Sequence, residues 1–219
     1  MNEKFFSLPE EKQRAIINAG YRVFSQNSYR KSPVSEIAET AGISKSLLFH
    51  YFRNKKELYL FLWENCAQVT HQYMEQFDCY RQTNLFEAMT QGLRAKVYVM
   101  RRYPDLGSFA VRAYCEKDPE VSGEIQKSAQ KYGAFQTNVA RLRLDAKQFI
   151  PGLDLELMYQ DMYWAAEGYL WEKTQQGSVD ADQMERDFER MIAFWKRLYL
   201  RKEDTGEGGQ EDADSGTKV

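Results

Sequence analysis

The sequence predicts an all-α fold, and three observations support that prediction. Apolar residues recur at spacings of three and four along almost the whole chain, which is the period of a helix buried on one face. The 219 residues include only 5 prolines, and these fall between the periodic segments rather than inside them. No segment of strand length alternates apolar and polar residues. We therefore expect about nine helices and no sheet.

Each of the first two helices has its own start and stop signals. Ser7 stands three residues before Glu10, and Pro9 falls in the first turn, so a helix should begin there. Ser32 and Pro33 open a second helix, which Gly42 ends. The apolar positions that these two helices should bury are Ile16, Ala19, Val23 and Phe24 in the first, and Val34, Ile37, Ala38 and Ala41 in the second.

The remaining helices follow from capping residues and breakers. Ser44 should cap a short third helix, and Asn54 with Glu57 forms a capping box at the start of a long fourth helix that runs to about Phe77. Pro104, Pro119, the Pro151–Gly152 pair and Gly177 then separate five further periodic segments. We expect these helices at about 84–102, 104–115, 119–145, 154–176 and 180–201.

The charge distribution is uneven. The net charge is −2, but residues 1–60 contain ten Lys and Arg against six Asp and Glu, which suggests an anionic partner for that part. Residues 203–219 contain six acids and one lysine and lack aromatic residues, so we expect a disordered acidic tail. The chain has no apolar run of membrane-spanning length and no signal peptide, which predicts a cytoplasmic, nucleoid-associated protein that does not bind membranes.

The segment ISKSLLFHYF, residues 43–52, raises the question of what its aromatic residues face. A short helix that follows another across a turn at Gly42 is the arrangement of a helix-turn-helix, whose second helix enters the DNA major groove. Leu48 and Phe52 lie four residues apart on the side that packs inward. Phe49 and His50 lie on other sides, so we expect them to face a partner.

The stretch SPVSEIAETAGISKSLLFHYFRNKKEL, residues 32–58, closely resembles the DNA-binding signature of the TetR family of bacterial transcriptional regulators. The resemblance implies a helix-turn-helix domain at 1–53 and a helical ligand-binding and dimerisation domain at 54–202. It also implies a homodimeric repressor that a small apolar or aromatic ligand, or a cationic one, releases from palindromic double-stranded DNA. Family members are not usually enzymes, and we expect no cofactor.

The resemblance also assigns DNA contacts. Lys45, Ser46, Leu47, Phe49 and His50 fall where the family contacts base edges or phosphates. The residues that fall where it grips the backbone are Ser44, Tyr51 and Lys55. The chain departs from the common pattern at Ser46, Leu47 and Phe49, and the last two lack the usual hydroxyl. An apolar side chain in the major groove can contact the thymine methyl, so we expect readout to depend on such contacts and on DNA shape.

Two further sets of residues are predicted in the second domain. The last two helices are apolar over a wide arc, and family members dimerise through these helices. The expected interface residues are Met158, Met162, Tyr169, Phe188, Met191, Trp195 and Leu198. Aromatic residues of the middle helices suggest a ligand cavity, although core packing would also use them. The expected cavity residues are Val69, Tyr73, Tyr98, Phe109, Phe135, Tyr159, Met162 and Tyr163, with Glu116, Asp161 and Glu167 as counter-charges for a cationic ligand.

Two alternatives remain open from the sequence. A DNA-binding regulator or nucleoid-associated protein could be controlled by a protein partner, with the aromatic residues serving only as core. A helical enzyme or binding protein could retain the helix-turn-helix as a vestige, but the intact donors Ser44, Lys45, Tyr51 and Lys55 argue against it. The sequence also has no catalytic triad, phosphate-binding loop or metal-ligand spacing. A solvent-open pocket would favour the ligand-responsive regulator over the first alternative.

Overall fold

The computed structural model describes residues 3–141, 145–177 and 179–201, with residues 132–141 described as backbone only. Within those ranges it contains ten α-helices, two short 3-10 helices and no β-strand, which confirms the all-α prediction. The single bridge in that part of the chain joins Phe149 to Leu200. The predicted acidic tail, 203–219, lies outside the described residues.

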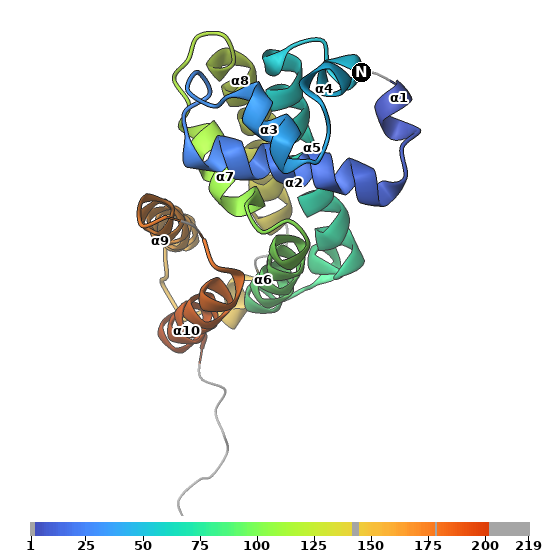
Figure 1. Cartoon of the computed structure of the whole chain (residues 1–219). Coiled ribbons are helices and arrows are strands. Elements are labelled where there is room, and N and C mark those ends of the chain that lie inside the picture. The colour runs from blue at the N-terminus through green and yellow to red at the C-terminus, as the bar shows by residue number, and fades with distance from the viewer. Residues whose placement is uncertain (1–2, 142–144, 178, 202–219) are drawn as a thin grey trace, which may run out of the picture.

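The N-terminal part comprises five helices (Figure 1): α1 (Glu3–Phe6), α2 (Glu10–Gln26), α3 (Val34–Thr40), α4 (Lys45–Tyr51) and α5 (Lys55–Gln76). The predicted caps of α4 and α5 are confirmed. Ser44 accepts a hydrogen bond from the Leu47 N–H, and Asn54 Oδ1 accepts one from the Glu57 N–H at 2.8 Å. The Glu57 carboxylate accepts the Arg53 N–H at 2.8 Å in return, which completes the capping box.

The start predicted for α2 was wrong in detail. Ser7 does not cap this helix, because its hydroxyl donates to the Lys4 carbonyl at 2.9 Å and so ends α1 instead. Pro9 precedes α2 without any side-chain cap. Helix α1 itself was missed, since four residues are too few to show a helical period.

The remaining described residues form five α-helices close to their expected bounds. They are α6 (Leu85–Arg102), α7 (Leu106–Tyr114), α8 (Ser122–Arg141), α9 (Leu155–Gln175) and α10 (Ala181–Tyr199). The 3-10 helices η1 (Cys79–Arg81) and η2 (Ala146–Gln148) lie between them. Helix α7 packs against α2, and α10 packs along α6. Figure 1 shows α6, α9 and α10 at the end of the molecule opposite α4.

Two hydrophobic clusters stabilise this arrangement. The first joins the helix-turn-helix to the body, because Phe24 of α2 contacts Tyr59 of α5 and Tyr59 contacts Phe109 of α7. The ring centroids are 4.8 Å and 5.4 Å apart in these two pairs. Packing is therefore continuous across the boundary expected between residues 53 and 54. The second cluster lies between α6, α9 and α10 and includes Met158 and Trp195.

The stripe predicted as a dimer interface packs largely within the chain. Met158, Met162 and Trp195 are at most 4% exposed and lie in the second cluster. Tyr169, Phe188 and Met191 are partly buried against the same cluster, whereas Leu198 is 45% exposed. The spacing of apolar residues shows which side of a helix is buried. It does not show whether the helix that covers this side belongs to the same chain or to a partner. The large apolar residues exposed on these two helices are Leu157, Tyr163, Trp164, Trp171, Phe194 and Leu198.

The turn between α3 and α4 gives a testable prediction. Gly42 has a φ of +69°, which a residue with a Cβ adopts only under strain, and no atom lies within 4 Å of the position that a Cβ would take there. Gly42→Ala should therefore lower the free energy of unfolding by about 1–2 kcal/mol through backbone strain alone. Urea denaturation would measure the loss. Gly123→Ala is the control, because that site is equally open and has no positive φ; equal stability of the two variants would contradict this account.

Candidate functional site

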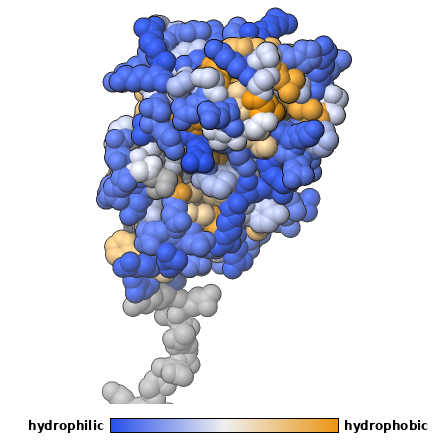
Figure 2. Space-filling view, in the orientation of Figure 1, coloured by the Kyte–Doolittle hydropathy of each residue, from blue (hydrophilic) through white to orange (hydrophobic). Residues whose placement is uncertain are grey.

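Helix α4 has an inner and an outer side. Leu48 is 1% exposed and Phe52, just after the helix, is 2% exposed, so both anchor α4 in the first cluster. Leu47 and Phe49 are 37% and 39% exposed on the outside. Figure 2 shows apolar side chains gathered over the region that α1 and α4 occupy in Figure 1. The outward residues predicted for DNA contact are therefore on the surface: Ser44, Lys45, Ser46, Leu47, Phe49 and His50.

The outer side of α4 combines polar and apolar groups in a small area. The Lys45 ammonium lies 5.9 Å from the centroid of the Phe49 ring, so a cation sits beside an exposed aromatic face. The hydroxyls of Ser44 and Ser46 are 3.0 Å apart. The His50 ring makes an edge contact with Tyr51, at 5.8 Å between centroids. Such a surface offers hydroxyl and ammonium donors for phosphates and apolar atoms for thymine methyls.

Tyr51 and Lys55 are more enclosed than the other predicted DNA contacts. Tyr51 is 8% exposed, and its ring centroid lies 6.1 Å from that of Phe5 of α1. The Lys55 ammonium donates to the Arg30 carbonyl at 3.1 Å and lies 4.9 Å from the Tyr29 ring centroid. Burial lowers the pKa of Lys55, while Glu120 and Asp118 act in the opposite direction. Both residues thus have structural partners inside the protein.

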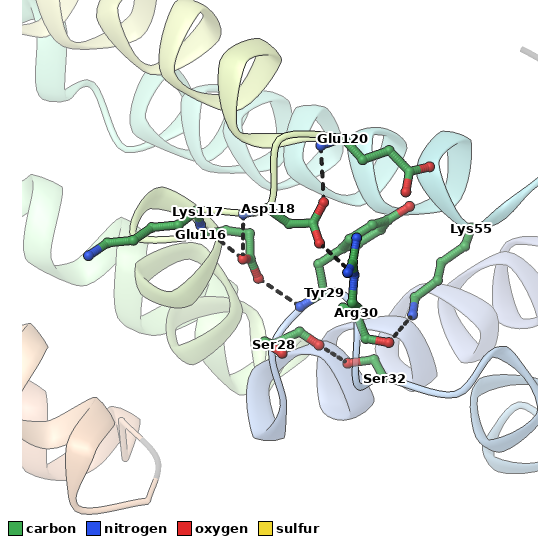
Figure 3. A network of polar contacts seen from close by, with 9 residues as sticks. All are labelled: Ser28, Tyr29, Arg30, Ser32, Lys55, Glu116, Lys117, Asp118 and Glu120. Carbon is green, nitrogen blue, oxygen red and sulfur yellow. Dashed lines mark hydrogen bonds and ion pairs between the residues drawn. The ribbon is translucent and has the colours of Figure 1, made fainter.

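An acidic segment after α7 holds the loop between α2 and α3 (Figure 3). The Tyr29 N–H donates to the Glu116 carboxylate at 2.7 Å, and Arg30 Nε lies 3.2 Å from Asp118 Oδ2. The other Glu116 oxygen accepts the backbone N–H groups of Lys117 and Asp118, at 2.9 and 3.0 Å. Glu116 therefore fixes this junction, where the sequence suggested a counter-charge for a ligand. We call these contacts the Glu116 junction.

Two cavities lie in the body. One, of about 290 Å³, is lined mainly by η1, α6, α9 and α10 and is partly open to solvent, and we call it the α6–α10 cavity. The other, of about 540 Å³, lies between α5, η1, α7 and α8, and we call it the α5–α8 cavity. Tyr80 of η1 lines both. A pair of cavities of this size is compatible with small-molecule binding, for which volumes of roughly 300–1,000 Å³ are usual.

Only part of the predicted ligand set lines a cavity. Tyr159, Met162 and Tyr163 line the α6–α10 cavity, as does Glu167. Phe109 instead lies fully buried in the first cluster. Val69 and Tyr73 pack against the first cluster, and Tyr98 is exposed beside Tyr73. The Asp161 carboxylate accepts a hydrogen bond from the Tyr199 hydroxyl. The Phe135 side chain lies outside the described residues. Sequence reasoning missed Lys96 in the cavity wall.

Metal sites, membrane spans and thiols each bear on the function of the described part of the chain. No group of three or more His, Cys, Asp or Glu side chains there is placed to hold a metal ion. None of the described helices combines the length and the apolar character needed to cross a membrane. Cys66, Cys79 and Cys115 are free thiols, and burial raises the pKa of Cys66 to about 12. The fold and the outward α4 together define a helix-turn-helix protein.

Comparison with known proteins shows a family match for the N-terminal part. Residues 16–61 match the model for bacterial regulatory proteins of the tetR family. The HTH-type transcriptional regulator RutR of Escherichia coli K12 is 30% identical over 105 residues, which are 48% of this chain and 46% of that protein. The fatty acid metabolism regulator of Bacillus subtilis is 36% identical over 53 residues, 24% of this chain and 27% of the relative. The chain thus spans about half the length of RutR and about a quarter of the length of the Bacillus subtilis regulator.

Solved structures share the fold over most of the chain. A TetR-family regulator from Chloroflexus aurantiacus has a TM-score of 0.57 at 22% identity, with 92% of this chain and 99% of that chain covered. A ketosteroid transcriptional regulator of Mycobacterium tuberculosis has a TM-score of 0.63 at 14% identity, with 90% and 98% covered. Residues 16–61 thus match the tetR-family DNA-binding region, and the described chain shares its fold with solved TetR-family regulators.

Proposed function

We propose that this protein is a homodimeric transcriptional regulator that inserts α4 into the DNA major groove. The single observation that carries the proposal is the division of α4 into a buried side around Leu48 and an exposed side around Leu47 and Phe49. Those two bulky apolar residues would be costly to expose without a partner. The name of the E. coli relative, a transcriptional regulator, supports the same conclusion.

The dimer interface that we propose differs from the one expected from sequence. On α9, Leu157, Trp164 and Trp171 are exposed and follow one another at seven-residue spacing, which places them along one side of the helix. Gly168 lies between the two tryptophans, and a Cβ there would meet no other atom within 4 Å, so a partner helix can approach closely. Phe194 adds an exposed apolar residue on α10. We assign these exposed residues, together with Leu198, to the contact with a second copy of the chain. Two α4 helices can read successive major grooves only if a dimer holds them about 34–36 Å apart.

A small molecule bound in the body would control DNA binding. The α5–α8 cavity supports this part of the proposal, because α5 forms one wall through Trp63 and Cys66 and begins at Lys55 beside α4. A ligand there would tilt α5 and move the two α4 helices out of register with the grooves. It must bind the DNA-incompetent form more tightly, because equal affinity shifts nothing. Relatives named for fatty acids and ketosteroids favour an apolar ligand over a purely cationic one.

The alternative of control by a protein partner would leave the cavities unused. The presence of two cavities favours the small-molecule mechanism over it. Release by a ligand also has a thermodynamic signature. The ligand must lower the affinity for DNA by the same factor by which DNA lowers the affinity for the ligand.

Phosphate contact should show in the salt dependence of DNA binding. Log affinity should fall steeply with log salt, and Lys55→Ala should make the slope shallower by roughly one contact. Tyr51→Phe, which keeps the buried ring, should weaken binding to all sequences similarly. Mobility shifts across a salt series measure both effects. Lys147→Ala removes an exposed charge from η2 and should leave the slope unchanged; a flat wild-type response would reject the proposal.

Thymine methyl readout is tested by replacing thymine with uracil at each half-site position in turn. Loss of one buried methyl should cost about 0.8 kcal/mol of binding free energy at the contacted position. Leu47→Ala or Phe49→Ala should remove that sensitivity, whereas Ser46→Ala, on the same exposed side, should retain it. If every uracil substitution is harmless, the two apolar residues do not read bases.

Dimerisation through the exposed side of α9 and α10 is tested by adding charge. Trp164→Glu with Phe194→Glu should give a monomer in sedimentation equilibrium at micromolar concentration and abolish specific DNA binding, because buried unpaired carboxylates are costly. Tyr98→Glu introduces the same charge at a residue of similar exposure on α6 and should remain dimeric. A wild-type monomer, or a dimeric double variant, would contradict the assignment.

A further inference from the structure

One side of α6 forms an apolar wall that ends in a positive charge. Leu85, Met89, Gly92 and Lys96 follow one another at spacings of four, three and four, and all line the α6–α10 cavity. At 1.5 Å per residue, the line from Leu85 to Lys96 is roughly 16 Å long. A ligand lying along α6 would therefore contact apolar side chains over most of its length and an ammonium at one end.

The other walls of the cavity are also apolar. They are contributed mainly by α9 and α10, through Met162, Leu170, Met184, Phe188 and Ile192. Gly92 has no side chain, and a Cβ at that position would be in ordinary van der Waals contact with the Met74 methyl, at 3.8 Å. Methionines on three sides can adjust to ligands of different shape.

Lys96 has no hydrogen bond or ion pair among the described residues. Its side chain is exposed to solvent where it lines the cavity. Desolvation by neighbouring atoms lowers the pKa of Lys96, while Glu167 and Cys79 act in the opposite direction. Glu167 of α9 lines the same cavity and forms no ion pair with Lys96 in the described structure. Because Lys96 makes no ion pair there, its ammonium can form a charged hydrogen bond with an anionic ligand in the cavity.

We propose that the α6–α10 cavity binds an amphiphile with one apolar chain and one singly charged carboxylate, and that this carboxylate pairs with Lys96. The positions of Lys96 and Glu167 favour an anionic end group. Lys96 stands at the end of the apolar line on α6, where the end group of a ligand would lie. Glu167 stands on α9 to the side of that line, next to the lining residues Tyr159, Tyr163, Ala166 and Leu170. The nearby Glu167 carboxylate would disfavour a second negative charge, so phosphate esters should bind less well than carboxylates.

This site is a different cavity from the α5–α8 cavity, although Tyr80 lines both, and the proposal does not depend on DNA binding. It can therefore be tested on the full-length protein without an operator. The probes are decanoate, decanol and decylamine, which share one chain and differ only in the end group. Isothermal titration calorimetry should rank decanoate tightest for the wild type.

Variants identify the groups responsible. Lys96→Met keeps the length of the side chain and should lower decanoate affinity by at least about tenfold, the usual effect of losing a charged hydrogen bond, with decanol affinity unchanged. Lys96→Arg should restore most of the decanoate affinity. Glu167→Gln should raise it several-fold by removing a like charge. Lys127→Met, on the exposed surface of α8, is the matched control and should bind like the wild type.

The proposal fails under three outcomes. Decanoate affinity unchanged in Lys96→Met would show that Lys96 does not bind the carboxylate. A preference for decylamine that is lost in Glu167→Gln would show that the site binds a cationic end group through Glu167. No binding of any probe to the wild type would reject the cavity as a site for amphiphiles. Retained decanol binding and an unchanged circular dichroism spectrum establish that the Lys96→Met variant is folded.

Discussion

The packing of aromatic rings between α2, α5 and α7 is the constraint on which the rest of the structure depends. Tyr21 and Phe24 of α2 meet Tyr59 of α5 and Phe109 of α7, and all four are at most 2% exposed. The Tyr21 hydroxyl also donates to Asn65 Oδ1 at 2.9 Å, which fixes the position of α5 relative to α2. Large buried rings lose much stability when displaced, so the helix-turn-helix moves with the body rather than independently of it.

Two physical routes lead from the body to α4 through this core. One is α5, which passes the α5–α8 cavity and has its N-terminus beside Arg30. The other is the Glu116 junction, where a carboxylate holds the Tyr29 N–H in the loop that precedes α3. The acidic segment around Glu116 also offsets part of the positive charge of the N-terminal 60 residues. A displacement of α7 or α8 can thus change the position of α4 through hydrogen bonds as well as through packing.

Local signals in the sequence predicted local structure well. Ser44, Asn54 and Gly42 determined where helices begin and end, because capping and backbone conformation depend on a few adjacent residues. The outward position of Phe49 and His50 followed for the same reason, since it depends on the spacing from Leu48 within one helix. Features that depend on distant partners could not be predicted in this way. The burial of Met158 and Trp195 inside the chain requires knowledge of where α6 lies. Lys96 was overlooked because a lysine on a helix is normally a solvated surface residue, and only the surrounding cavity gives it another role.

The central claim, that two copies of α4 read successive major grooves, is tested most directly by footprinting on DNA. A duplex selected by the protein from a random pool would be treated with dimethyl sulfate, which methylates guanine N7 in the major groove, and with hydroxyl radicals, which report on the backbone. The account predicts two symmetric protected regions on the selected duplex, centred about 10 base pairs apart or at a multiple of that spacing, with N7 protection in each. A single asymmetric footprint, or backbone protection without any protection in the major groove, would contradict it.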